Sequence, residues 1–162
     1  MKKILFIIAA LMTFAACGDK NDPTPEPVDP VLPPICKEWE SLDADLKIYL
    51  SFKTKGNVDT GDFRIYQKTT DEGYDLYCGT WNTEGNILSG SYNDGETWAY
   101  SYEFEIYSEP VNTNDTAIYL KLKATEEGGK ENMFVACTIP EVIKETSDVV
   151  VKGHPADGTP IL

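Results

Sequence analysis

Apolar and polar residues alternate one by one along the middle of this chain, and no other feature limits the fold as strongly. Successive side chains of a β-strand point to opposite faces of the sheet, so this alternation predicts strands with one apolar face. The apolar rows are Leu46, Ile48, Leu50 and Phe52; Phe63 and Ile65; Trp98, Tyr100, Tyr102, Phe104 and Ile106; Ile118, Leu120 and Leu122; and Met133, Val135, Cys137 and Ile139. The third row is one face of the longest predicted strand. No segment shows a sustained helical period, although Pro140 to Lys144 fits one helical turn that begins at the proline.

Short runs of turn-forming residues separate the predicted strands. Segments 82–86 and 93–95 contain Asn, Asp and Gly, which tolerate the positive φ of tight hairpins, and segments 59–62 and 126–129 mark two further turns. With a short first strand over Lys37–Ser41, the pattern predicts eight strands joined by short links. Eight successive antiparallel strands favour a closed up-and-down barrel, because closure removes the exposed edges. A two-sheet sandwich is the main alternative, but sandwiches usually need longer crossover connections.

The first residues have the pattern of a secretory signal peptide. Two lysines precede an apolar stretch that is too short to span a bilayer and ends in small residues. The sequence Phe14-Ala15-Ala16-Cys17 resembles a bacterial lipoprotein box, which predicts cleavage before Cys17 and acylation of this cysteine; an ordinary secretory cleavage nearby is the alternative. Gly18 to Asp22 resembles the acidic tether that directs Bacteroidetes-type lipoproteins to the outer membrane and often to its outer surface.

Composition divides the rest of the chain. Residues 23–34 hold six of the ten prolines and favour an extended spacer rather than a core. We therefore predict a signal peptide over residues 1–16, an acylated cysteine and Pro-rich tether over 17–35, a barrel over 36–143 and a tail over 144–162. Loss of Lys2 and Lys3 with the signal peptide leaves 12 basic against 27 acidic residues, a net charge near −15. Such a surface repels phosphate backbones, which argues against nucleic-acid binding.

The stretches "YCGTW" at residues 77–81, "GNILSGSYNDG" at 85–95 and "ETWAYSY" at 96–102, with "TIPE" at 138–141, resemble the small lipocalin-like lipoproteins of Bacteroidetes-type bacteria. The likeness spans roughly Trp39 to Ile143. It implies an eight-stranded barrel of the lipocalin or calycin type. It implies no catalytic residues, because the biochemical function of that family is largely unassigned.

Three cysteines remain in an oxidising compartment once Cys17 is lipidated, so one disulfide is plausible there. In an eight-stranded barrel the first and last strands pair antiparallel, which brings Cys36 and Cys137 to the same end. The sequence therefore predicts a Cys36–Cys137 disulfide and a free thiol at Cys78. The cysteine and histidine spacings match no structural zinc site, and we predict no metal and no cofactor.

The candidate ligand-binding residues are the aromatic row Trp98, Tyr100, Tyr102 and Phe104, because an eight-stranded barrel can enclose one small ligand. The same rings can instead simply fill the interior. Arg64, the only arginine, is a further candidate as a carboxylate partner, although the alternation places it opposite Phe63 and Ile65, toward solvent.

No catalytic motif is present, so we expect no enzyme. The predicted function is that of a lipid-anchored lipocalin-like protein of the outer membrane, exposed at the cell surface, that binds a small apolar or amphipathic ligand. The alternative is a packed barrel that serves as an accessory subunit, with a protein partner, in a surface nutrient-uptake or envelope complex.

Overall fold

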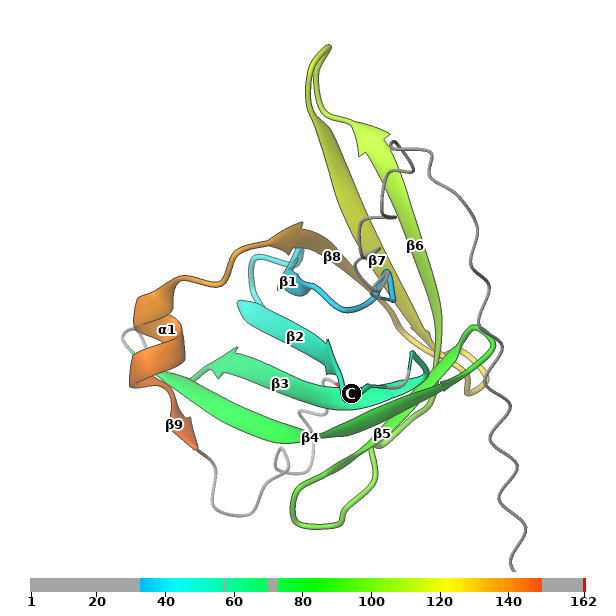
Figure 1. Cartoon of the computed structure of the whole chain (residues 1–162), viewed down its shortest axis with the longest axis vertical. Coiled ribbons are helices and arrows are strands. Elements are labelled where there is room, and N and C mark those ends of the chain that lie inside the picture. Colours follow the sequence, from blue (N-terminus) through cyan, green and yellow to red (C-terminus); the bar gives the residue numbers. More distant parts are fainter. Residues whose placement is uncertain (1–32, 57, 70–72, 150–161) are drawn as a thin grey trace, which may run out of the picture. The chain divides into compact units, whose positions relative to one another are not determined.

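Eight antiparallel strands form one sheet that closes on itself (Figure 1). The computed structural model describes residues 33–56, 58–69, 73–149 and 162. The strands of the ring are β1 (Glu38–Ser41), β2 (Ile48–Thr54), β3 (Thr60–Lys68), β4 (Tyr74–Glu84), β5 (Ile87–Tyr92), β6 (Tyr102–Pro110), β7 (Thr116–Ala124) and β8 (Glu131–Cys137). Each strand pairs with the next in the sequence, and β1 pairs with β8 to close the ring. The predicted up-and-down barrel is confirmed, and the two-sheet sandwich is not formed.

The inner faces of the strands are the apolar rows of the sequence, with two corrections. Ile48, Leu50 and Phe52 of β2 are buried in the barrel core, as are Phe63 and Ile65 of β3. The first correction concerns β8, where the core contains Phe134 and contacts Ala136 instead of the predicted row from Met133 to Ile139. Cross-strand register explains the difference, because Phe134 pairs with Leu120 and Ala136 pairs with Trp39, and paired residues share a face.

The second correction concerns the predicted longest strand. β6 begins at Tyr102, so Trp98 and Tyr100 precede it in the loop between β5 and β6, and the longest strand is β4 with 11 residues. The chain turns at Gly95, where φ is 96°, and the main-chain N–H of Trp98 then donates to the Gly90 carbonyl. The loop thus folds back over β5, which breaks the alternation before Tyr102.

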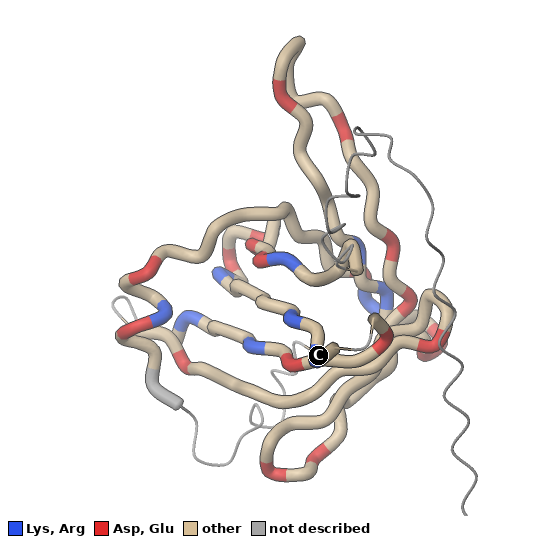
Figure 2. The backbone as a smooth tube through the Cα atoms, in the orientation of Figure 1, with Lys and Arg blue, Asp and Glu red and all other residues tan. Residues whose placement is uncertain are grey.

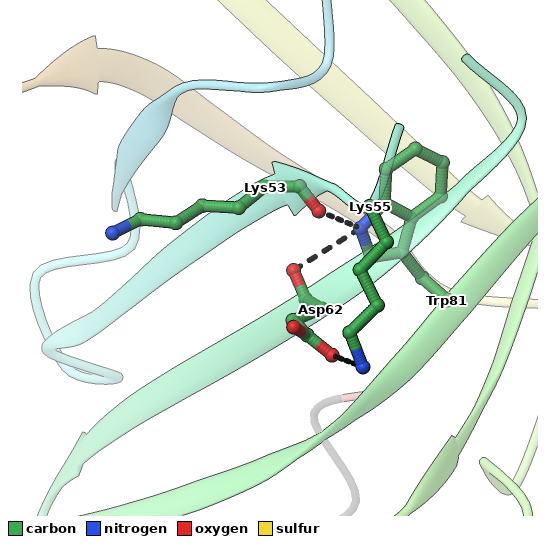
Figure 3. Close-up of polar contacts among 4 residues, drawn as sticks. All are labelled: Lys53, Lys55, Asp62 and Trp81. Atoms are coloured by element: carbon green, nitrogen blue, oxygen red, sulfur yellow. Dashed lines mark hydrogen bonds and ion pairs between the residues drawn. The ribbon is translucent and has the colours of Figure 1, made fainter. Parts of the chain in front are cut away.

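Glycines inside the strands make room for aromatic rings. Gly61, predicted to be part of a turn, lies in β3 directly opposite Trp81 of β4. A Cβ atom at this position would be 2.7 Å from Trp81 Nε1 and 1.8 Å from the Lys53 oxygen. The absence of a side chain allows the indole N–H to donate to the carbonyls of Lys53 at 3.2 Å and Asp62 at 3.1 Å (Figure 3). Trp81 therefore ties three neighbouring strands together.

A short helix covers the outer face of β3 and β4. The predicted helical turn is α1 (Glu141–Thr146), which follows Pro140. Its residue Ile143 packs with Ile139 against Tyr66 and Leu76, which alternate with the core residues of their strands. Glu38 joins the helix to β1, because one of its oxygens accepts from the Ile139 N–H at 2.7 Å and the other lies 2.8 Å from Lys144 Nζ.

The predicted tail, residues 144–162, contains ordered parts. Strand β9 (Asp148–Val149) pairs parallel with the start of β4, where β5 does not reach, and so covers that edge. Leu162 is buried in the barrel core. Ile35, the last residue of the predicted tether, is buried in the core as well. The barrel unit therefore extends beyond the predicted limits of 36 and 143 at both ends.

The β6–β7 hairpin projects beyond the ring (Figure 1). β5 pairs with β6 only at Glu103 and Tyr102, whereas β6 and β7 pair along nine positions. On the outer face, the Lys121 ammonium lies 2.5 Å from Glu105, and the rings of Tyr107 and Tyr119 stack at 5.4 Å. These cross-strand pairs join β6 to the part of β7 that also pairs with β8. From Ser108 and Ile118 to the end of the hairpin, β6 and β7 pair only with each other in the described sheet.

Within the described residues no helix is long and apolar enough to cross a membrane. The predicted signal peptide and the lipidation site Cys17 lie outside the residues that the structure describes.

Candidate functional site

Five rings meet inside the barrel and form what we call the inner aromatic cluster: Phe63 of β3, Tyr77 of β4, Tyr92 of β5, Trp98 of the β5–β6 loop and Tyr102 of β6. Phe63 lies at the centre, with its ring centroid 5.0 Å from that of Trp98 and 5.5 Å from that of Tyr92. Tyr102 contacts Trp98 at 6.3 Å, and Tyr77 contacts Tyr92 at 6.4 Å. All four contacts are edge-to-face, the geometry that aromatic quadrupoles favour.

Two glycines in adjacent strands create the space for this cluster. A Cβ atom on Gly79 would lie 2.6 Å from the Phe63 ring and 2.1 Å from the Ser91 oxygen. A Cβ atom on Gly90 would lie 2.5 Å from the Trp98 indole. Any larger residue would push the two rings away from β4 and β5, so glycine at these positions sets the location of Phe63 and Trp98.

The three tryptophans differ in how their indole nitrogens are satisfied. All three side chains are buried. Trp39 donates to the Ile35 carbonyl at 3.0 Å, and Trp81 donates to two carbonyls of β2 and β3. Trp98 is only 5% exposed, yet its Nε1 is a buried side-chain polar atom with no hydrogen-bond partner in the described structure. Leaving a buried donor unpaired costs about 1–3 kcal/mol, so this nitrogen distinguishes Trp98 from the other two tryptophans.

The phenols of the cluster stay protonated at neutral pH. Burial raises the pKa of Tyr92, and the neighbouring phenols of Tyr102 and Tyr77 add to this effect. Burial likewise raises the pKa of Tyr102. The Tyr92 hydroxyl donates to the main-chain oxygen of Leu162 at 3.1 Å. Among the described residues, Ser51 is the one buried side chain outside the hydrophobic set, so no charged side chain of these residues is buried.

A pocket of about 380 Å³ adjoins the cluster at its rim. Trp98 and Tyr100 line it together with residues from β4, β5 and the β5–β6 loop, and the polar part of the lining is mainly hydroxyl and amide: Asn82, Ser89, Ser91, Thr97 and Ser101. The pocket lining thus combines aromatic rings with hydrogen-bonding groups. Such a surface suits the polar end of an amphipathic molecule.

The structure brings together some of the predicted ligand-binding residues and separates others. Trp98 and Tyr102 lie in the inner aromatic cluster. Tyr100 is 37% exposed at the rim, with its ring 6.5 Å from that of Tyr102. Phe104 is half-buried against the barrel core. Arg64 is exposed on the outer face, where a hydrogen bond with the Tyr66 side chain raises its pKa, so it does not join the cluster.

Sequence reasoning missed Tyr77, Tyr92 and Leu162 as site residues. Tyr92 directly precedes the Asn93–Gly95 turn, and Tyr77 lies two residues before Gly79. The available signal was glycine: Gly79 and Gly90 interrupt strand patterns, and an isolated glycine in a strand indicates a close approach by another group. Nothing in the sequence indicated that Leu162 returns to the core.

The cysteines do not provide a reactive centre. Cys36, Cys78 and Cys137 are free thiols in the structure, so the predicted Cys36–Cys137 disulfide is not formed. Cys36 packs against the barrel core, whereas Cys137 packs against the apolar residues beneath α1 on the outer face of the sheet. Burial raises the pKa of all three thiols, that of Cys137 to about 11, so the nucleophilic thiolate form is rare at neutral pH.

No group of three or more metal-ligating side chains occurs in the part of the chain that the structure describes. Comparison of the chain with protein-family models, with curated proteins and with solved structures found no significant match.

Proposed function

We propose that this chain is a lipoprotein of the outer membrane, anchored through acylated Cys17 and exposed at the cell surface, and that its barrel binds a small apolar or amphipathic molecule without catalysing a reaction. The observation that carries the binding proposal is the unpaired Nε1–H of Trp98 within the inner aromatic cluster. The five rings supply apolar contact area, and the indole supplies a donor with no partner in the described structure. A ligand with an oxygen acceptor would satisfy this donor.

The binding proposal is tested on protein released from its own membranes. Native mass spectrometry is expected to show a retained molecule of a few hundred daltons, and organic extraction is expected to remove it. The Trp98→Phe variant is expected to retain less of this molecule than the variant Tyr107→Phe, in which an aromatic side chain of the outer face changes instead. Equal retention by both variants, or no retained molecule in any preparation, would contradict the proposal.

The anchoring proposal has a separate test. Metabolic labelling with a fatty acid that carries an alkyne group is expected to label the wild-type chain and not the Cys17→Ala variant. The variant is also expected to leave the membrane fraction. Labelling of the variant, or its unchanged sedimentation with membranes, would refute acylation at Cys17. Protease digestion of intact cells then separates surface exposure from a periplasmic orientation.

A second candidate function is that of an accessory subunit with a protein partner in a surface nutrient-uptake or envelope complex. The projecting β6–β7 hairpin favours it, because β6 beyond Phe104 has β7 as its strand neighbour in the described sheet while its other edge lacks a paired strand. Acidic residues lie along β6 of this hairpin and would favour a basic partner strand (Figure 2). Site-specific crosslinking from Tyr107 in intact cells tests this function, which predicts one dominant crosslinked protein.

A further inference from the structure

Leu162 is held inside the barrel although it belongs to no strand of the described residues. Its side chain is 1% exposed, and its main-chain oxygen accepts the hydrogen bond from the Tyr92 hydroxyl. The chain end marked C in Figure 1 lies within the ring of strands. The residue therefore reaches the interior from a position 70 residues away from its hydrogen-bond donor.

The chemistry of this contact is that of a small ligand. The branched apolar side chain of Leu162 lies in the hydrophobic core, and its main-chain oxygen accepts from a phenolic donor. Ladder hydrogen bonds fix the aromatic residues of β3 to β6 in the wall of the barrel, whereas Leu162 has no ladder position. A group that is held by side-chain burial and a phenol can be exchanged for another group of similar chemistry, whereas a strand residue cannot.

We propose that Leu162 is an internal occupant of the ligand site, and that the ligand is a neutral or anionic molecule with an apolar chain and a carbonyl oxygen that takes over the hydrogen bond from Tyr92. This inference rests on the proposed binding function and names the chemistry of the same site. Trp98 Nε1–H lies in the same aromatic cluster and supplies a second donor, which Leu162 leaves unused. Binding of the ligand displaces Leu162, so the leucine lowers the apparent affinity of the barrel.

The magnitude of this competition follows from the burial of a leucine. Burying its side chain corresponds to a factor of about ten to a hundred in an equilibrium constant. Because Leu162 must leave the site before the ligand binds, replacement of Leu162 by a smaller residue is expected to tighten ligand binding by about tenfold or more. Loss of the Tyr92 donor removes its hydrogen bond with Leu162 in the free protein and its hydrogen bond with the ligand in the complex. It is therefore expected to lower the preference for a carbonyl ligand over a ligand without an acceptor by about two- to tenfold.

The test uses the mature chain, the fluorescent reporter N-phenyl-1-naphthylamine and two competitors, methyl decanoate and decane. The Leu162→Gly variant is expected to bind methyl decanoate about tenfold more tightly than the wild type. The matched control is Leu42→Gly, which removes a leucine that is 51% exposed in a loop and is expected to leave the affinity unchanged. Tyr92→Phe is expected to lower the ratio of the methyl decanoate affinity to the decane affinity by about two- to tenfold, because decane lacks an acceptor.

The outcomes separate this inference from the proposed function. Equal affinity of the wild type and Leu162→Gly would overturn the inference and leave ligand binding intact, whereas no binding by any of the proteins would contradict the proposed function itself. An unchanged ratio of the two affinities in Tyr92→Phe would overturn the assignment of the acceptor.

A measurement on the wild type covers the case in which Leu162→Gly does not fold. The chemical shifts of the Leu162 methyl groups are expected to move toward those of a solvent-exposed leucine as methyl decanoate binds. Unchanged Leu162 methyl resonances at saturating ester would overturn the displacement.

Discussion

Replacement of Trp98 by phenylalanine is expected to destabilise the barrel far less than the same replacement of Trp81. Both side chains are buried and both contact other rings of the core. They differ in the hydrogen bonds of the indole nitrogen, because Trp81 donates to two carbonyls and the Trp98 donor is unpaired. The pair of variants therefore compares one chemical change in two hydrogen-bonding environments.

The expected difference follows from these hydrogen bonds. Trp81→Phe removes one N–H that is shared between two carbonyls, and this hydrogen bond contributes about 0.5–1.5 kcal/mol to the free energy of unfolding. Trp98→Phe removes a buried unpaired donor, which relieves a desolvation cost of about 1–3 kcal/mol. The loss of apolar volume is similar in both variants. Trp98→Phe should therefore be more stable than Trp81→Phe by at least about 1.5 kcal/mol.

Urea unfolding of the mature chain, followed by circular dichroism, measures the two free energies of unfolding. Equal destabilisation by the two substitutions would refute the reasoning, because it would mean that the Trp98 nitrogen has a partner in the free protein. Trp98→Phe is also expected to weaken binding of methyl decanoate. A variant that retains stability and loses ligand affinity is the expected signature of a residue selected for binding rather than for folding.

Three further predictions concern packing and pH. Gly90→Ala is expected to lower the free energy of unfolding by about 1–3 kcal/mol, because its Cβ would overlap the Trp98 indole, whereas Ser89→Ala on the other face should change it by less than about 0.5 kcal/mol; similar values for both would contradict the close approach. Burial raises the pKa of Glu38, but the hydrogen bonds with Lys144 and the Ile139 N–H outweigh burial and leave this pKa below its usual 4.5. The stability that Glu38 contributes is therefore present above pH 4.5 and is lost as the pH falls through the lowered pKa, so Glu38→Gln should flatten the acid limb of a stability profile. Burial and the hydrogen bond to Glu40 raise the pKa of Tyr49 from 10.0 to about 12, so the unfolded chain loses this proton first and stability falls between pH 10 and pH 12. Tyr49→Phe should lose less stability over that range, and an unchanged alkaline limb would count against the assignment.

The ring of strands was predictable because alternation and turn residues act locally. The alternation of Ile48, Leu50 and Phe52 indicates the inner face of β2 even when the partner strands are unknown. Gly85, with φ of 62°, likewise allows the β4–β5 turn by its own backbone conformation. The inner face of β8 was not predictable in this way. Both of its faces carry apolar residues, so the pairing of Phe134 with Leu120 decides which face turns inward.

The candidate site was predictable only in part, because long-range packing determines it. The row from Trp98 to Phe104 has strand alternation, but the loop folds back over β5. The main-chain N–H of Trp98 donates to the Gly90 carbonyl and holds the loop there. Trp98 thus reaches the interior from a loop rather than from a strand. The unpaired state of its nitrogen depends on the position of every neighbouring carbonyl, and the return of Leu162 to Tyr92 joins residues with no shared local pattern.

The central claim is that the interior beside Trp98 receives the oxygen acceptor of a ligand, and the indole N–H resonances of the mature protein test it most directly. Trp39 and Trp81 donate to carbonyls within the protein and serve as internal controls. On addition of methyl decanoate, the Trp98 resonance is expected to move downfield while the other two remain in place. If the ester displaces the fluorescent reporter and the Trp98 resonance does not move, the ligand binds elsewhere and the account of this site is wrong.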